Sequence, residues 1–267
     1  MEQFKVVVVG LGVQGKKRAL IAGSDLVATV DLDIANKADF KKITELNLNT
    51  FDAVLLCTPD NPNDKISLIK YFLENKKHVL VEKPLFPENY LDFQEIKNLA
   101  RSKKVYFYVA YNHRFEPHFK RMRDLIESSE LGSIYNLRMF YGNGTARLVK
   151  NSIWRDSGKG VVMDIGSHLV DTLLFWFGKK NLRLNNLKSF NYENKSPDHA
   201  IMSGSIDKIN FQLEVSLLSW KNSFTCDVFA EKGTAHINSL CKWGPSEFII
   251  RKRKYPSGLP DEKKITI

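Results

Sequence analysis

The chain has 267 residues, of which 43% are hydrophobic and 26% charged, which excludes a disordered, collagen-like or repeat protein. This length allows one large domain or two smaller ones. The net charge of +10 comes from basic residues spread over many segments without a nucleic-acid motif, so a solvated surface that favours anionic small molecules is expected rather than nucleic-acid binding.

Neither the overall composition nor any single segment indicates export or a membrane-spanning helix. The first five residues include an acid and lack the basic and apolar regions of a signal peptide. The most apolar later stretch, residues 169–177, contains Asp171 and is far shorter than the ~20 residues of a membrane helix, so it predicts a buried helix. The three cysteines are scattered and match neither a disulfide framework nor a metal site. We therefore expect a cytoplasmic protein without a metal or a membrane partner.

Short apolar strands alternate with helical segments in the first part of the chain. The strands are almost wholly apolar, which is typical of a parallel sheet buried on both faces. This pattern predicts a doubly wound α/β domain, a Rossmann fold, over residues 1–114. The expected strands are 5–9, 27–31, 53–57, 78–81 and 105–110, and the expected helices are 14–22, 65–74 and 88–102.

Residues 10–15 form a G-x-G-x-x-G run between the first expected strand and a helix. Gly10 can make the tight turn, Gly12 lets backbone N–H groups approach a pyrophosphate, and Gly15 lets helix and strand pack closely. The helix N-terminus adds a partial positive charge that favours phosphate. We therefore expect a dinucleotide site that also includes Val13 and Gln14.

Asp31 ends the second expected strand, 21 residues after Gly10. A carboxylate at this position accepts hydrogen bonds from the ribose hydroxyls of a dinucleotide and repels a 2′-phosphate. The following residue, Leu32, is not the arginine that accommodates such a phosphate. NAD is therefore the expected cofactor, and NADP is less favoured.

Two further runs, Cys-Thr-Pro at 57–59 and Glu-Lys-Pro at 82–84, follow the third and fourth strands. Doubly wound sheets bind ligands at these carboxyl ends, so we expect Thr58, Pro59, Glu82 and Lys83 beside the cofactor. A lysine at a strand end is by itself more often a surface residue than a functional one.

After residue 114 the pattern predicts an α+β domain over residues 115–267. An amphipathic helix at 119–128, a strand at 134–141 and a helix at 164–177 come first. Strand-like segments with short connections then follow, which predicts a mostly antiparallel open sheet. These segments are 182–190, 200–206, 210–220, 223–230 and 233–238.

Asp164 and His168 lie four residues apart at the start of the second expected helix in this domain, a spacing that places two side chains on one helix face. A histidine titrates near neutral pH and can carry a proton, and a nearby carboxylate can orient it. Taken alone, such a pair more often marks a helix start with a packed histidine.

The motifs together resemble the Gfo/Idh/MocA family, which is named for glucose-fructose oxidoreductase and inositol dehydrogenase. The resemblance covers residues 4 to about 178, and the rest of the chain matches only in its β-rich pattern. It implies that Lys83, Asp164 and His168 form the catalytic set. The motifs that carry it are the glycine run at 10–15, Asp31, the runs at 57–59 and 82–84, Y-N-H-R-F at 111–115 and D-I-G-S-H at 164–168.

The resemblance also implies a reaction, the reversible oxidation of a hydroxyl group in a sugar, cyclitol or nucleotide sugar. His168 would take the proton of the hydroxyl while hydride passes from the same carbon to NAD. Lys83 would hydrogen-bond that oxygen, and Asp164 would bind a neighbouring hydroxyl or orient His168. The expected substrate contacts are Asn112, Arg114 and Arg155. We further expect a homodimer or homotetramer that associates through the open face of the second sheet.

Two departures from the family keep an alternative open. Only residues 32–52 separate Asp31 from the third strand, which predicts that a helix beside the adenine pocket is reduced or lost. The chain also ends soon after the last expected strand, whereas family members generally continue. The alternative is a non-catalytic NAD-binding sensor or scaffold on the same fold. The presence of Lys83, Asp164 and His168 together favours the enzyme, because a sensor does not need a proton-transfer group.

Overall fold

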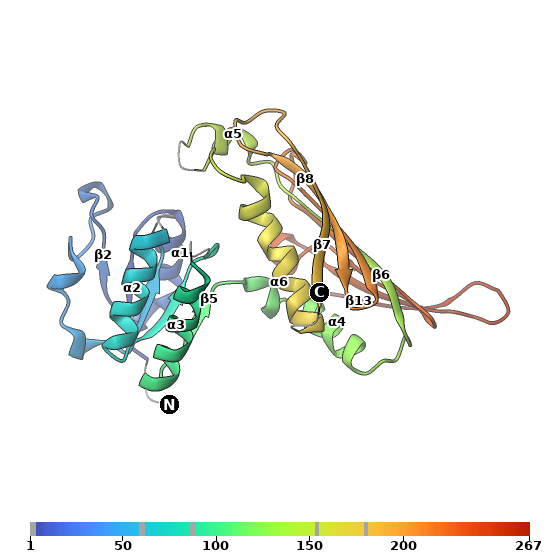
Figure 1. Cartoon of the computed structure of the whole chain (residues 1–267), viewed down its shortest axis with the longest axis horizontal. Helices are drawn as coiled ribbons and strands as arrows, with labels where there is room; N and C mark the ends of the chain where they lie inside the picture. Colours follow the sequence, from blue (N-terminus) through green and yellow to red (C-terminus); the bar gives the residue numbers. More distant parts are fainter. Residues whose placement is uncertain (1–3, 59–61, 86–88, 153–154, 179–180) are drawn as a thin grey trace. The chain divides into compact units, whose positions relative to one another are not determined.

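The computed structural model describes residues 4–58, 62–85, 89–152, 155–178 and 181–267 (Figure 1). The chain divides into two units, residues 1–110 and 111–267. The division falls a few residues before the boundary expected at 114, because the 3₁₀ turn Asn112–Phe115 packs against helix α6 (Ser167–Phe177) of the second unit. Within the described ranges, no helix is long and apolar enough to cross a membrane.

Unit 1 is built on a five-stranded parallel sheet in the order β2-β1-β3-β4-β5. From β1 the chain goes first to β2 on one side and then crosses to β3 on the other side of β1. The direction in which successive strands are added therefore reverses between β1 and β3. Doubly wound sheets bind ligands at this reversal, outside the carboxyl ends of the strands. The expected Rossmann fold is therefore confirmed. The strands are β1 (Val6–Val9), β2 (Leu26–Val30), β3 (Ala53–Leu56), β4 (His78–Val81) and β5 (Phe107–Val109), and the helices are α1 (Val13–Ala22), α2 (Pro62–Glu74) and α3 (Tyr90–Lys103).

The core of unit 1 lies between its sheet and the helices α2 and α3. Ile69 and Phe72 of α2 and Ile96 of α3 are fully buried against apolar strand residues such as Val54. An ion pair of 2.8 Å between Lys70 and Asp92 joins the two helices. Because parallel crossovers are right-handed, α1 covers the opposite face of the sheet.

The link between β2 and β3 contains three short 3₁₀ turns, Ile34–Asn36, Ile43–Glu45 and Leu48–Thr50, and no α-helix among its described residues. Phe40 lies beside the end of β2, where its N–H donates to the Thr29 carbonyl at 3.1 Å and its carbonyl accepts from the Asp31 N–H at 3.1 Å. The expected loss of a helix here is confirmed.

Unit 2 contains an eight-stranded sheet in the order β13-β12-β11-β10-β6-β9-β8-β7. All neighbours are antiparallel except β6 and β9, which run parallel, so the expected mostly antiparallel sheet is confirmed. The strands are β6 (Ile134–Gly142), β7 (Leu182–Phe190), β8 (His199–Ile206), β9 (Ile209–Ser216), β10 (Ser223–Ala230), β11 (Gly233–Asn238), β12 (Glu247–Lys252) and β13 (Asp261–Thr266).

Sequence reasoning missed the last two strands, β12 and β13, and the short helix α5 (Ala146–Lys150). β13 begins with two acids and two lysines and forms an edge of the sheet, where charged side chains are typical and the apolar alternation is weak. The strand expected at 210–220 ends earlier, at Ser216, because the chain turns after it and Trp220 has a positive φ of 56°.

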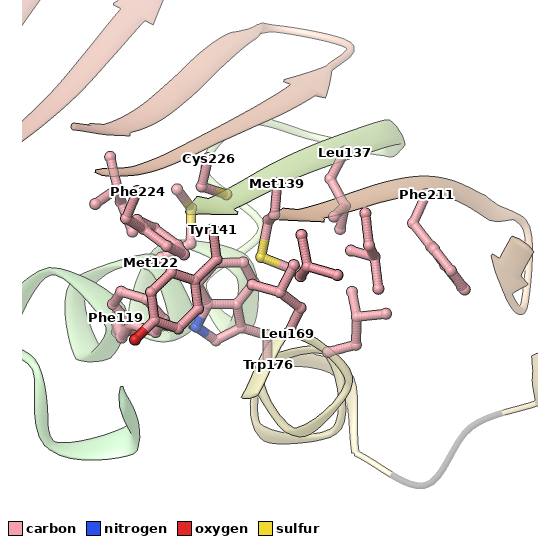
Figure 2. Packing of buried hydrophobic residues seen from close by; sticks show 14 of the residues in the cluster. Phe119, Met122, Leu137, Met139, Tyr141, Leu169, Trp176, Phe211, Phe224 and Cys226 are labelled. Carbon is pink, nitrogen blue, oxygen red and sulfur yellow. Dashed lines mark hydrogen bonds between the residues drawn. The ribbon is translucent and has the colours of Figure 1, made fainter. Parts of the chain in front are cut away.

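Helices α4 (Pro117–Glu127) and α6 lie against one face of this sheet and form the larger core (Figures 1 and 2). Phe119 and Met122 of α4 and Leu169 of α6 are fully buried. The indole N–H of Trp176 donates to the Phe119 carbonyl at 3.0 Å, which ties the two helices together. Burial of one such large apolar side chain contributes about 1.5–3 kcal/mol.

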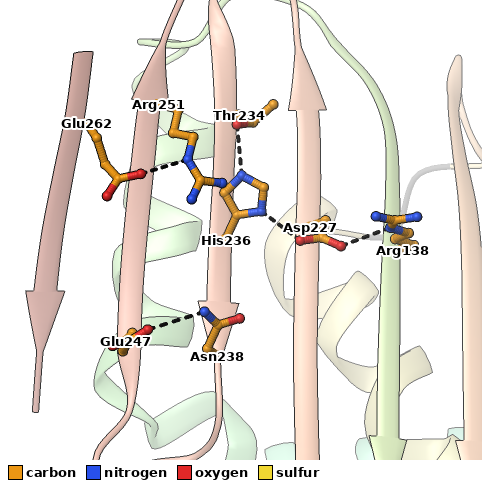
Figure 3. A network of polar contacts seen from close by, with 8 residues as sticks. All are labelled: Arg138, Asp227, Thr234, His236, Asn238, Glu247, Arg251 and Glu262. Atoms are coloured by element: carbon orange, nitrogen blue, oxygen red, sulfur yellow. Dashed lines mark hydrogen bonds and ion pairs between the residues drawn. The ribbon is translucent and has the colours of Figure 1, made fainter. Parts of the chain in front are cut away.

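The opposite face of the sheet carries polar side chains in a network across neighbouring strands (Figure 3). The carboxylate of Asp227 contacts Arg138 Nε at 2.8 Å and His236 Nδ1 at 2.6 Å. The other ring nitrogen of His236 lies 2.8 Å from the hydroxyl of Thr234. Strands β6, β10 and β11 are therefore joined by side chains as well as by their backbones.

Candidate functional site

The glycine run forms a tight turn after β1. Gly10 has a φ of 91°, and a Cβ there would lie 2.8 Å from the carbonyl carbon of Cys57. A Cβ on Gly15 would lie 1.7 Å from the Gly10 carbonyl oxygen. At Gly12, by contrast, a Cβ would meet no atom within 4 Å. Gly10 and Gly15 are thus required by packing, whereas Gly12 leaves open space beside the backbone.

The N-terminus of α1 follows this turn and faces the same space. Gly12 is the N-cap, no side chain in the described ranges caps the helix, and its first turn contains no acid. The first N–H groups of a helix have no partner within the helix and attract anions. Val13 and Gln14 lie in this turn with exposed side chains. The residues present therefore fit a bound pyrophosphate.

Asp31 is fixed beside the turn by three hydrogen bonds. Its Oδ2 accepts from the Leu11 N–H at 2.5 Å and from Asn36 Nδ2 at 3.2 Å, and its Oδ1 accepts from the Asp33 N–H at 2.8 Å. A carboxylate has about four acceptor positions, so capacity remains for a ribose hydroxyl. Leu11 and Asn36 were not singled out in the sequence, because neither residue type has a role in the motif.

Thr58 follows β3 at the carboxyl edge of the sheet. Its Oγ1 is buried and has no hydrogen-bond partner in the part of the chain that the structure describes, whereas most buried hydroxyl groups have one. A cofactor at this edge would supply that partner. Burial, with the charge of Glu82, raises the pKa of the neighbouring Cys57 to about 12, so this thiol remains neutral. Pro59, the other expected contact here, lies outside the described residues.

Glu82 and Lys83 follow β4 at the same edge. The Glu82 carboxylate pairs with Arg18 of α1, with contacts of 2.7 Å to Nε and 2.6 Å to Nη2. Glu82 therefore holds α1 against the end of β4, a role that the sequence did not suggest. Lys83 comes next, and its peptide bond to Pro84 is cis.

Asp164 and His168 belong to unit 2, whereas Lys83 belongs to unit 1. Asp164 lies in a turn of π-helix, Val162–Gly166, that continues into α6, and His168 lies in the first turn of α6 and is 6% exposed. The segment between them therefore begins as π-helix rather than as the regular α-helix that the sequence predicted, and their shared helix face stays a prediction. Turns of π-helix are frequent at functional sites.

Two arginines expected at the substrate have carboxylate partners within unit 2. Arg155 pairs with Asp164 at 3.2 Å, which connects it to the expected catalytic set. Arg114 makes two hydrogen bonds to Asp171 of α6. Asn112 begins the 3₁₀ turn that carries Arg114. The substrate roles of these three residues stay predictions.

His113 lies beside the expected catalytic histidine, although the sequence did not indicate a function for it. Its ring stacks on that of His168, with centroids 4.4 Å apart and planes 24° apart. Both residues lie within the motifs of the resemblance, but they are far apart in the chain. The sequence contains no signal that the two rings meet.

Comparison with solved structures gives the same fold over the whole chain. An NADPH-dependent oxidoreductase, described as putative, from Desulfitobacterium hafniense matches with a TM-score of 0.83 at 15% identity, covering 100% of this chain and 83% of that one. A levoglucosan dehydrogenase in complex with NADH and levoglucosan matches with a TM-score of 0.81 at 16% identity, covering 99% and 80%.

Among curated proteins, an uncharacterised oxidoreductase of Schizosaccharomyces pombe is 32% identical over 143 residues, 52% of this chain and 37% of its own length. A myo-inositol 2-dehydrogenase of Thermotoga maritima is 31% identical over 88 residues, 33% of this chain and 25% of its own. The matches thus span well under two thirds of these relatives.

Two family models match in succession along the chain. The model described as "Oxidoreductase family, NAD-binding Rossmann fold" matches residues 4–111, and that described as "GFO/IDH/MocA C-terminal domain" matches residues 119–236. They correspond to the two units of the structure. The chain therefore belongs to the Gfo/Idh/MocA family of oxidoreductases with an NAD-binding Rossmann fold.

Proposed function

We propose that the protein is an NAD-dependent dehydrogenase or reductase that interconverts a hydroxyl group and a ketone in a sugar, cyclitol or nucleotide sugar. The observation that carries the proposal is the burial of His168, 6% exposed, in the helical turn that follows Asp164. A protein that only binds NAD has no need of a proton-transfer group in that position. The relatives named for inositol and levoglucosan support a polyhydroxylated substrate.

The cofactor part of the proposal rests on unit 1. The N–H groups at the start of α1 bind the pyrophosphate, and Asp31 accepts the ribose hydroxyls. Thr58 donates its hydroxyl hydrogen bond to the same ligand. When bound, NAD supplies the acceptor for the hydride. We expect NAD rather than NADP because the charge of Asp31 repels a 2′-phosphate.

The catalytic part assigns the proton to His168. Its imidazole accepts the hydroxyl proton as the alcohol is oxidised and returns it in the reverse direction. Lys83 donates a hydrogen bond to the reacting oxygen, which stabilises negative charge that develops there. Asp164, held by Arg155, binds a neighbouring hydroxyl or orients His168.

The alternative is a non-catalytic NAD-binding sensor or scaffold. This alternative is supported by the absence of an α-helix from the described residues of the β2–β3 link, which favours weak cofactor binding. The retention of Lys83, Asp164 and His168 in one chain favours the enzyme.

A turnover screen tests this proposal. NAD and NADH are each incubated with a panel of sugars, inositols and nucleotide sugars or their keto forms, and absorbance at the nicotinamide band is followed. With the substrate found, His168→Ala should lower turnover by about 100- to 10,000-fold, the contribution of a positioned general acid or base, while NAD affinity stays unchanged. Lys83→Ala should also lower turnover. Near-normal turnover in His168→Ala would remove the mechanism, and NAD binding without any substrate would favour the sensor.

We also propose a homodimer or homotetramer that associates through the open face of the second sheet. Ile201 of β8 points away from the core on this face and is 41% exposed. Ile201→Glu should shift the light-scattering mass at micromolar concentration toward the monomer. A monomeric wild-type chain under the same conditions would contradict the proposal.

A further inference from the structure

Two histidines from different elements of unit 2 stack face to face. His113, in the 3₁₀ turn Asn112–Phe115, lies with its ring centroid 4.4 Å from that of His168 in α6, and their planes differ by 24°. His113 is 1% exposed and His168 is 6% exposed. The contact is therefore a fixed, nearly parallel pair of imidazole rings with little access to water.

Aromatic rings enclose the pair. Tyr111 meets His168 edge-on at 5.7 Å, and Tyr141 of β6 lies 6.0 Å from His168 and 5.2 Å from His113. Phe119 of α4 lies 5.2 Å from His113. The rings of the two histidines are thus held from several elements, which leaves His168 few orientations.

The charged and titratable groups around the pair come from each of these elements. Asp164, in the turn before α6, is paired with Arg155, and the carboxylate of Asp171 in α6 is paired with Arg114. Burial, with the charge of Asp164 nearby, raises the pKa of Tyr141, so its hydroxyl stays protonated. Further groups among the described residues are the hydroxyl of Tyr111 and, toward Tyr141, the carboxylate of Glu116.

Two positive charges at this separation repel each other strongly. For centroids 4.4 Å apart and an effective dielectric constant of about 20, the repulsion displaces the second protonation by roughly 2–3 pH units. The two rings then titrate as one coupled system. Mutual repulsion therefore disfavours a second proton on the pair.

We propose that His113 is a positioning residue for the acid–base group: its ring fixes the plane of His168, and the two stacked rings together hold at most one proton. The proposal rests on the proposed function of His168. A proton on either ring then prevents His168 from accepting the hydroxyl proton of a substrate. His113 remains neutral while His168 carries that proton, so the stack goes from no charge to one and never holds two.

A titration by NMR tests the coupling without substrate or cofactor. The chain contains six histidines, and ¹⁵N-histidine labelling of the full-length protein with single substitutions assigns their signals. Wild type, His113→Phe and His168→Phe are compared, because phenylalanine keeps a flat ring and removes the titrating group. In at least one variant, the protonation midpoint of the remaining ring should rise by about 2 pH units.

His118 provides an internal reference in the same spectra. It is 1% exposed and stacks on Phe248, a ring that does not titrate, and burial lowers its pKa. Its midpoint should be the same in all three proteins. The coupling is refuted if His113 and His168 each keep their wild-type midpoints within about 0.3 pH unit in the variants. If a phenylalanine variant does not fold, the wild-type protein alone tests the coupling. Two independent protonation midpoints of His113 and His168 within about 0.5 pH unit of each other would then refute it.

The positioning role is measured with the substrate that the turnover screen identifies. His113→Leu should lower kcat by about 10-fold or more with KM changed by less than about threefold, because a flexible side chain no longer fixes the His168 ring. His113→Phe should recover kcat to within about threefold of wild type. The control is His118→Leu, an equally buried histidine in the same unit, which should leave kcat within about twofold. Equal losses in His113→Leu and His118→Leu would overturn the positioning role.

These experiments separate the inference from the proposed function. Coupled titration without turnover of any panel compound would contradict the proposed function and leave the one-proton stack standing. Turnover that depends on His168, together with uncoupled titration, would contradict the stack and leave the proposed function standing.

Discussion

Arg114 binds the carboxylate of Asp171 through two parallel hydrogen bonds, from Nε to Oδ2 at 2.8 Å and from Nη2 to Oδ1 at 2.5 Å. Asp171 is 6% exposed and is the charged residue that interrupts the most apolar stretch of the sequence. The pair joins the 3₁₀ turn Asn112–Phe115 to α6 and so brings His113 to His168.

Arg114→Leu should therefore destabilise the protein, because it leaves a buried carboxylate without its partner. Breaking a buried pair costs about 3–5 kcal/mol, and we expect about 2–4 kcal/mol here since the Arg114 side chain is one-third exposed. Urea unfolding measures this loss. The control is Arg123→Leu, since Arg123 also lies over Phe175 but pairs with an exposed Glu127 at 3.6 Å. Its cost should stay below about 1 kcal/mol, and equal costs would contradict the structural role of Arg114.

Two alanine substitutions in the glycine run should have opposite effects. Gly15→Ala forces a Cβ to within 1.7 Å of the Gly10 carbonyl oxygen, so the thermal midpoint should fall sharply or the protein should fail to fold. Gly12 has a φ of −63° and open space at its Cβ, so Gly12→Ala should unfold within a few degrees of wild type. Its NAD affinity should nevertheless fall by about tenfold or more, because the methyl group would occupy the place expected for the pyrophosphate. Calorimetric NAD binding equal to wild type would contradict this placement.

The choice of cofactor should depend on Asp31. Wild type should bind NAD at least about tenfold more tightly than NADP, or about 1.4 kcal/mol. Asp31→Asn should reduce this preference, since the like-charge repulsion of a 2′-phosphate is lost. Asp52→Asn is the matched control, because it removes the same charge just before β3, at the amino end of the sheet. Isothermal calorimetry on the three proteins measures the affinities for NAD and NADP. Equal or tighter binding of NADP by wild type would contradict the assignment of NAD as the cofactor.

The stability of the open face should depend on pH through Asp227. Burial works to raise the pKa of this carboxyl, but hydrogen bonds from His236 and Arg138 outweigh it, and the pKa is lowered. A lowered pKa means that the stabilisation is present above the unfolded value of about 3.9 and is lost as pH falls through the folded value. Asp227→Asn should therefore cost about 1–3 kcal/mol at pH 7, with the difference from wild type shrinking below about pH 4. The measurement is urea unfolding at a series of pH values.

The control is the exposed ion pair Arg251–Glu262. Glu262→Gln should lower the free energy of unfolding by less than about 1 kcal/mol. A cost for Asp227→Asn that does not change with pH would contradict the argument.

The two-part architecture and the strand, glycine turn and helix of the expected cofactor site could be predicted from sequence alone. Local geometry explains this: the glycine turn, the strand before it and the helix after it are neighbours in the chain, so their spacing fixes the backbone of the turn. The position of Asp31 beside the glycine turn could be predicted for a similar reason, because the carboxyl ends of adjacent parallel strands meet at one edge of the sheet. Alternation of apolar residues likewise predicted the central strands of the second sheet. It failed for β13, where the charged side chains of an edge strand hide that pattern.

Which side chains meet within each unit could not be predicted from the sequence. Arg114 and Asp171, Arg18 and Glu82, and His113 and His168 are each far apart in sequence, and no local pattern encodes such contacts. The π-helical turn at Asp164 is equally hidden, because its residues also fit an α-helix. These contacts depend on how helices and strands pack, since burial of a charge or an imidazole ring is tolerated only where a partner arrives from another element.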